Sequence, residues 1–153
     1  MQIEEEIKQS RKFENQYEKL VVNVMFTNSW IVDEQTKIFK PYDLTNPQYN
    51  VLRILRGQYP KVCTVNMIID RMIDRMSNAS RIVDRLELKN FVERTVCKTD
   101  RRAKDVLITE KGLALLEEVD KALENWLKKF GHVSEEEVND MNTCLDRLRT
   151  PRT

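Results

Sequence analysis

The segment SNASRIVDRLELKNFVER (residues 77–94) predicts a short amphipathic helix that leads into a β-strand. Ala79, Val83 and Leu86 follow one another at spacings of four and three residues, which places them on one face of a helix. We expect this apolar face to be buried against the rest of the domain. Ser77 stands directly before the helix, and its side chain is predicted to cap the first turn.

The opposite side of this helix is polar and carries groups that suit the recognition of DNA. Asn78, Arg81 and Arg85 are separated by three and four residues, so they share the exposed face close to the helix N-terminus. Arginine can bond two acceptors of guanine in the major groove, and asparagine can do the same for adenine. Ser77 and Ser80 are small donors for phosphates or base edges. The alternative is a solvated face on which the arginines pair with neighbouring aspartates.

A β-hairpin with a basic tip is predicted after the helix. Two β-prone runs, residues 92–97 and 105–109, flank the charged segment KTDRRAK (residues 98–104). Such a tip can insert an arginine into the minor groove, and a carboxylate beside it can aim the guanidinium. A charged tip that serves only solubility is the alternative. The DNA-contacting residues predicted for the hairpin are Arg94, Lys98, Asp100, Arg101, Arg102 and Lys104.

Two further short helices are predicted before this segment. The first spans residues 47–56, with Thr45 or Asn46 as its N-cap and Gly57 as the left-handed residue that ends it. Thr64 is predicted to cap the second. The apolar residues of the second helix are Met67, Ile68, Met72 and Ile73.

Long helices with apolar stripes are predicted at both ends of the chain. Near the N-terminus the stripe consists of Phe13, Tyr17, Leu20, Val21, Val24 and Ile31. Thr109 is predicted to cap a helix over residues 110–130, and Ser134 with Glu137 forms a capping box before the last helix. The stripes of these two helices are Leu116, Val119, Leu123, Trp126 and Phe130, then Val138, Met141, Leu145 and Leu148. The segment between the terminal helices is too small to cover the apolar stripes at both ends of the chain. We therefore expect these stripes to pair with those of a second copy in a homodimer. A monomeric bundle with internal stripes is the alternative.

Composition and charge limit the classes of function. Residues 70–104 hold ten Lys/Arg against six Asp/Glu, whereas residues 110–146 hold four against ten, which would orient the molecule on a polyanion.

No apolar run approaches a membrane span, and the acidic N-terminus is not a signal peptide, so we expect a cytoplasmic protein. With one histidine, His132, and no Gly-rich phosphate loop, we expect no metal, no cofactor and no enzymatic activity. The cysteines are Cys63, Cys97 and Cys144, an odd number without a CxxC pair, which is typical of free thiols.

The sequence resembles the MarR family of winged helix-turn-helix transcriptional regulators. The resemblance is carried by SRIVDRLELKNFVER, then DRRAK, then VLITEKG, in this order, and is strongest from Ser77 to Gly112. It implies a recognition helix over residues 77–90 and a wing over residues 92–109. It also implies that Arg102 is the wing-tip arginine and Asp100 its partner. Family members often carry a glycine in the turn before the recognition helix, where this chain has MIDRM (residues 72–76).

We therefore predict a mainly α-helical protein with a small β-hairpin wing. Residues 1–40 and 110–153 are expected to form the dimerisation helices, and residues 44–109 the winged helix-turn-helix lobe that binds double-stranded DNA. The homodimer would place two recognition helices on a pseudo-palindromic operator, with half-sites roughly 10 bp apart, and would act as a repressor or an activator of transcription. A winged-helix module for protein–protein contact, without sequence-specific DNA binding, is the alternative. Salt-dependent binding to duplex DNA distinguishes the two.

The resemblance also implies a small-molecule effector, because many family members bind small aromatic ligands between the dimer helices and the lobe. Trp30, Phe39, Tyr42 and Tyr49 are the residues predicted to line such a cleft, and packing in the core is the alternative for them. Cys63 precedes a predicted helix N-terminus, which can lower the pKa of a thiol. For each of the three cysteines we nevertheless expect a buried, inert thiol and assign no redox role.

Overall fold

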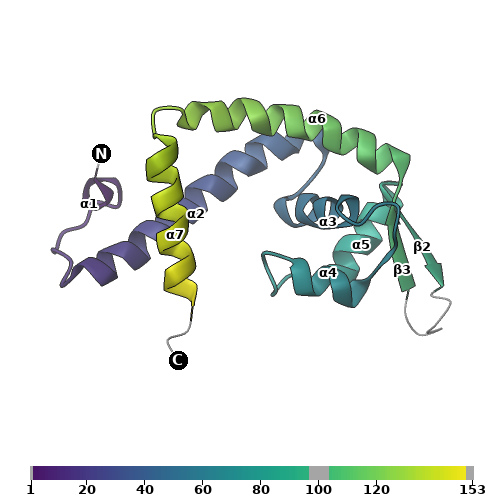
Figure 1. Cartoon of the computed structure of the whole chain (residues 1–153), viewed down its shortest axis with the longest axis horizontal. Coiled ribbons are helices and arrows are strands. Elements are labelled where there is room, and N and C mark those ends of the chain that lie inside the picture. The colour runs from purple at the N-terminus through teal and green to yellow at the C-terminus, as the bar shows by residue number, and fades with distance from the viewer. Residues whose placement is uncertain (1, 97–103, 151–153) are drawn as a thin grey trace.

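The computed structural model describes residues 2–96 and 104–150. Two long helices, α2 and α6, pack against each other. A small lobe lies at one end of the molecule, and α1 and α7 lie at the other (Figure 1). The lobe contains α3, α4, α5 and a three-stranded sheet. The elements in chain order are α1 (Ile3–Glu6), α2 (Gln16–Phe39), the 3-10 turn η1 (Lys40–Tyr42), α3 (Asn46–Arg56), β1 (Cys63–Thr64), α4 (Val65–Arg71), α5 (Ala79–Leu88), β2 (Val92–Val96), β3 (Lys104–Ile108), α6 (Glu110–Leu127), the 3-10 turn η2 (Lys128–Phe130) and α7 (Glu135–Arg149).

Side-chain caps start most of these helices where the sequence predicts them. Thr45 accepts a hydrogen bond from the Gln48 N–H and forms a reciprocal capping box with that residue at the start of α3. Thr64 and Thr109 cap α4 and α6 in the same way, through one backbone N–H each. The capping box of Ser134 and Glu137 before α7 is also confirmed.

Two expectations about the ends of helices differ from the structure. The N-terminal region is not one helix, because the Asn15 Oδ1 accepts the N–H groups of Tyr17 (2.9 Å) and Glu18 (3.0 Å) and starts α2 at Gln16. Gly57 ends α3 with φ −64°, so it is not left-handed. After α5 it is Asn90 that adopts the left-handed backbone conformation, with φ 60°. Asparagine tolerates this conformation better than most residues.

The predicted hairpin is present, and a third strand extends it. Strands β2 and β3 pair antiparallel with Val92 opposite Ile108 and Val96 opposite Lys104. Strand β1 adds to the other side of β3, with Cys63 opposite Val106. A two-residue strand has no alternation of its own, so sequence reasoning did not predict β1.

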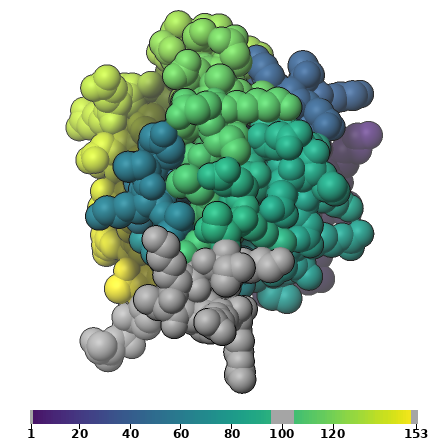
Figure 2. Space-filling view, turned by 90° about the vertical axis from the view of Figure 1, so that its right-hand side faces the viewer, coloured from purple at the N-terminus to yellow at the C-terminus, as the bar shows by residue number. Residues whose placement is uncertain are grey.

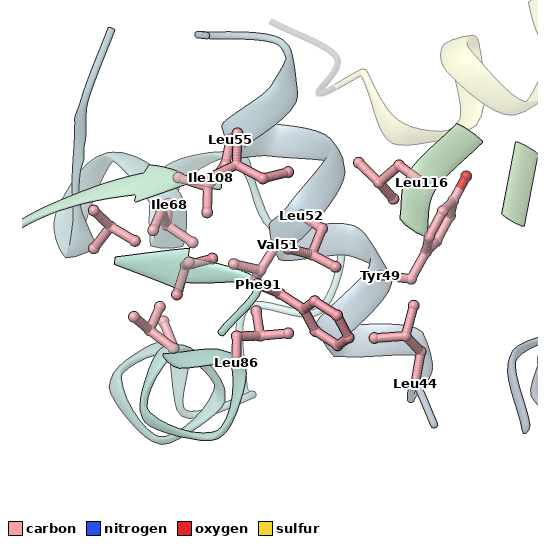
Figure 3. Close-up of a cluster of buried hydrophobic side chains, with 14 of the residues drawn as sticks. Leu44, Tyr49, Val51, Leu52, Leu55, Ile68, Leu86, Phe91, Ile108 and Leu116 are labelled. Atoms are coloured by element: carbon pink, nitrogen blue, oxygen red, sulfur yellow. The ribbon is translucent and has the colours of Figure 1, made fainter. Parts of the chain in front are cut away.

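One hydrophobic core joins the lobe to the two long helices. Side chains from the lobe and from α6 converge on it (Figure 3), and Phe39 of α2 packs its ring 4.5 Å from the ring of Tyr49. At Gly112 the first turn of α6 lies so close to the lobe that a Cβ atom would be 2.3 Å from the Phe91 carbonyl oxygen. The fully buried residues include Leu52, Leu86, Ile108 and Leu116, each contributing about 1.5–3 kcal/mol by burial.

The ends of the chain leave apolar side chains uncovered. On α2, Tyr17, Val21 and Met25 are 81%, 53% and 67% exposed. Among residues 104–150, α7 buries none of its side chains, although Val138, Met141 and Leu148 lie along it. Within the described segments, the helices are too short or too polar to cross a lipid bilayer.

Candidate nucleic-acid interface

Helix α5 has one buried face and one exposed polar face. Ala79, Val83 and Leu86 are buried, as predicted, and hold the helix against α3 and the sheet. Arg81 and Arg85, one turn apart, are exposed. Figure 2 shows the end of the molecule that carries the lobe, where teal side chains of the lobe reach the surface beside the green side chains of α6. The side chains of Arg81 and Arg85 are therefore open to solvent in the single chain.

The first turn of α5 is capped by Asn78, not by Ser77 as predicted. The Asn78 Oδ1 accepts the Arg81 N–H at 3.0 Å, whereas the Ser77 hydroxyl donates to the Asp74 carboxylate at 2.6 Å. Bidentate recognition of adenine requires both amide atoms of an asparagine. The Asn78 oxygen therefore caps the helix N-terminus, and the predicted contact of Asn78 with a base stays a prediction.

The turn between α4 and α5 is built by side chains in place of a glycine. Helix α4 ends at Arg71, earlier than the apolar pattern through Ile73 predicts. The Ile73 N–H donates to the Asn50 Oδ1 of α3 at 3.0 Å, and the Met76 N–H donates to the Asp74 Oδ1 at 3.0 Å. The Ser77 hydroxyl and the Met76 N–H hold the pKa of Asp74 below its ordinary value. An aspartate followed three residues later by a serine is the sequence signal that could have indicated this turn.

Arg94 of β2 turns back onto α5 instead of outward. Its side chain is only 13% exposed, and its Nη1 lies 2.5 Å from the Asp84 Oδ1. Its Nη2 donates to the Ser80 carbonyl at 3.1 Å, and its Nε lies 3.8 Å from a Glu87 oxygen. The prediction that Arg94 contacts DNA therefore does not agree with the structure, because carboxylates of α5 take up its charge. Arg94 instead fixes the hairpin to the helix that precedes it.

Lys89, at the end of α5, is likewise engaged within the chain. Its Nζ lies 3.0 Å from the Asp43 carboxylate and 3.5 Å from the Gln48 side-chain oxygen. Asp43 lies in the loop before α3 and the buried Gln48 lies in α3 itself, so Lys89 ties the end of α5 to both.

The basic tip of the hairpin falls outside the described residues. Lys98, Asp100, Arg101 and Arg102 all belong to that segment, and the predictions for them stay predictions. Lys104 opens β3 opposite Val96, at the end of the hairpin nearest to the tip.

A groove of about 310 Å³ runs between the N-terminus of α3 and the exposed face of α5. Arg81 and Arg85 line one side, and Thr45 and Pro47 at the start of α3 line the other. A helix N-terminus carries partial positive charge from its free N–H groups, so both walls of the groove favour an anion.

The aromatic residues predicted to line a ligand cleft do not come together. A cavity of about 680 Å³ lies between α2, α3 and the turn before α5, and of the four only Tyr49 lines it. Phe39 is fully buried, and the Tyr42 hydroxyl donates to the Glu118 carbonyl at 3.4 Å. Trp30 packs against Trp126 and Phe130 at the crossing of α2 and α6, with ring centroids 6.4 and 5.9 Å apart. Trp30, Phe39 and Tyr42 do not line this cavity, because each packs against α6 or the core. The cavity is lined by Asn28, Ile31, Val32, Gln35, Thr36, Leu44, Thr45, Asn46, Pro47, Tyr49, Asn50, Arg53, Met72, Ile73 and Asp74.

The cysteines show no arrangement for redox chemistry in the described segments. Cys63 is fully buried in β1, and burial raises the pKa of its thiol despite the helix N-terminus that follows. Cys144 is exposed on α7, so the expectation of a buried thiol holds for Cys63 and fails for Cys144. Cys97 lies outside the described residues.

Comparisons with known proteins agree with this architecture. The model of the MarR family matches residues 44–104. The HTH-type transcriptional regulator PecS of Dickeya dadantii (strain 3937) is 26% identical over 132 residues, which cover 84% of this chain and 80% of PecS. A mutant of MarR from E. coli, solved in complex with operator DNA, superposes with a TM-score of 0.79 at 21% identity, covering 92% of this chain and all of that one. BpsR of Bordetella bronchiseptica, solved in a study of the regulation of its DNA binding by 6-hydroxynicotinic acid, gives a TM-score of 0.66 at 23% identity, covering 84% of this chain and 99% of that one.

Proposed function

We propose that this chain is a transcriptional regulator of the MarR family, which it resembles over residues 44–104, and that it binds a pseudo-palindromic operator as a homodimer with α5 in the major groove. The observation that carries the proposal is the exposed pair Arg81 and Arg85 on an N-capped helix. Arg81 lies in the first turn, where recognition helices contact base edges. A guanidinium there can bond O6 and N7 of one guanine. Ser80, also exposed, is a donor for a neighbouring phosphate.

The groove between α3 and α5 supports contact with the DNA backbone. Arg85 and the first residues of α3 line it together, so a phosphate would meet a guanidinium and a helix N-terminus at once. Contacts of this kind fix the register of a protein on the duplex without reading its sequence. Arg85 is therefore assigned to the backbone and Arg81 to a base.

The hairpin is assigned the role of a wing that lies along the adjacent minor groove. Arg94 attaches β2 to α5 through Asp84, so the wing and the recognition helix would approach DNA as one unit. Lys98, Arg101, Arg102 and Lys104 are proposed to supply its positive charge, with Asp100 aiming Arg102.

The dimer interface is proposed to lie on the uncovered ends of the chain, residues 1–40 and 110–153. The exposed apolar residues of α2 and the unburied α7 are the supporting observations, since monomers seldom expose contiguous apolar faces of this length. Two copies related by a two-fold axis would present two α5 helices about one turn of DNA apart, roughly 10 bp.

Selection of bound sites from random duplexes tests the proposal. We expect a motif of two inverted half-sites with a spacing of roughly 10 bp, and binding that weakens steeply with salt. Recovery of no motif, together with weak binding to any duplex, would contradict the proposal and would favour a winged-helix module for protein–protein contact.

Release from DNA by a small aromatic effector is proposed as the regulation of this activity. The cavity of about 680 Å³ has the size of a small-molecule site, and its walls include Asn50 and Asp74, whose side chains form the turn before α5. A ligand that displaced these hydrogen bonds would shift the recognition helix. Titration of operator complexes with benzoate, salicylate and hydroxynicotinate should release the wild type more readily than Val32→Trp, whose larger side chain would occupy part of the cavity. Equal release of both proteins, or of neither, would contradict this mode of regulation.

A further inference from the structure

Met76 is a large apolar residue whose side chain is exposed just before the N-terminus of α5. Its exposed fraction is 94%, the highest among the large hydrophobic residues of the described segments. Met72, four residues earlier, is 4% exposed and belongs to the core. Met76 stands two residues before Asn78, the N-cap of α5, and so lies at the end of the helix that is proposed to enter the major groove.

The backbone at Met76 is held in place although the side chain is not. Its N–H donates to the Asp74 Oδ1 at 3.0 Å, and the same carboxylate accepts the Ser77 hydroxyl at 2.6 Å. The preceding Ile73 N–H is bonded to Asn50 of α3. Because the backbone is fixed on both sides, only the Met76 side chain has to be ordered when it meets a partner, and the cost of ordering a loose loop is avoided.

The major groove contains one apolar group for such a side chain, the 5-methyl group of thymine. Its other base-edge groups are hydrogen-bond donors and acceptors, which a thioether cannot satisfy. A flexible, polarizable methionine adapts well to a small apolar partner.

We propose that Met76 is a specificity-determining residue that packs against the 5-methyl group of a thymine in the operator. The inference rests on the proposed function, since it requires α5 to enter the major groove. It adds an apolar contact at the edge of the half-site, outside the bases that Arg81 reads.

Replacement of single thymines by uracil in the selected duplex tests the contact, because it removes only the methyl group. For the wild type, uracil at one symmetric pair of positions should weaken binding about fourfold per half-site, the effect of one lost methyl contact. Met76→Ala should bind the thymine and uracil duplexes equally, and Met76→Leu should keep part of the preference. Leu88→Ala is the matched control, since Leu88 is 83% exposed at the opposite end of α5 and should leave the preference intact.

A preference for thymine that persists in Met76→Ala at every position would overturn the assignment, as would a wild type that is indifferent to uracil throughout. Melting temperatures of the variants separate a lost contact from a lost fold. Failure of the selection to recover any motif is a different result, because it refutes the proposed function and the inference falls with it.

Discussion

Replacement of Arg94 by alanine tests whether Arg94 positions the wing or contacts DNA. In the folded chain its guanidinium bonds the Asp84 carboxylate and the Ser80 carbonyl and is only 13% exposed. Arg94→Ala removes these contacts and leaves the Ser80 carbonyl without this donor. A hydrogen bond to a charged group contributes about 1.5–3 kcal/mol, and the Asp84 side chain is 55% exposed, which lowers the value. We expect the free energy of unfolding to fall by about 1.5 kcal/mol.

The dependence of operator affinity on salt is the decisive assay. A residue that neutralises one phosphate changes the slope of log K against log salt by about 0.9. Because Arg94 is occupied by α5, Arg94→Ala should weaken binding while the slope stays unchanged. Lys104→Ala, at the proposed phosphate-contacting end of β3, should lower the slope by about 0.9 and leave the stability nearly unchanged.

Two further variants sharpen the comparison. Arg94→Lys keeps the charge but cannot bond both Asp84 and the Ser80 carbonyl in the same fork geometry, so it should resemble the alanine variant. In a double-mutant cycle, Asp84→Ala combined with Arg94→Ala should cost less than the sum of the single changes. A slope reduced by about 0.9 in Arg94→Ala, with an unchanged free energy of unfolding, would refute the assignment of Arg94 to the helix.

Other substitutions test the remaining parts of the structure. Gly112→Ala should destabilise the protein by about 1–3 kcal/mol in chemical denaturation, since the new Cβ would lie 2.3 Å from the Phe91 carbonyl oxygen; unchanged stability would show that α6 and the lobe are not in this close contact. Asp74→Ala should lower operator affinity while circular dichroism reports the same helix content, because it removes the hydrogen bonds that shape the turn before α5; full affinity would mean that the turn forms without them. In the folded protein at pH 8, Cys63 should react with a thiol reagent far more slowly than in denaturant, since burial raises the pKa of its thiol and blocks access; mass spectrometry of peptides identifies the labelled site, and equal rates in the two states would contradict the burial.

Local signals in the sequence predicted the elements whose start and face are encoded within a few residues. Thr45, Thr109 and Ser134 cap helices because their side chains reach N–H groups of the next turn, a contact that needs no distant partner. The buried face of α5 followed from spacing alone, as Ala79 and Val83 demonstrate.

Contacts between distant segments could not be predicted in this way. Arg94 meets Asp84 only because β2 folds back along α5, and Ile73 meets Asn50 only because α4 packs on α3. The same limit applies to the proposed ligand residues, since an aromatic side chain at a helix junction can face a cavity or the core. Trp30 faces α6, and the junction alone did not reveal this.

The most direct test of the account compares Arg81→Ala with the wild type on two duplexes of equal length, the selected operator and a random sequence, at the same salt concentration. If Arg81 reads a base, the variant should lose about 1–3 kcal/mol of binding free energy on the operator and far less on the random duplex. Equal losses on both duplexes, or no loss on either, would contradict the claim that the exposed face of α5 recognises the DNA sequence.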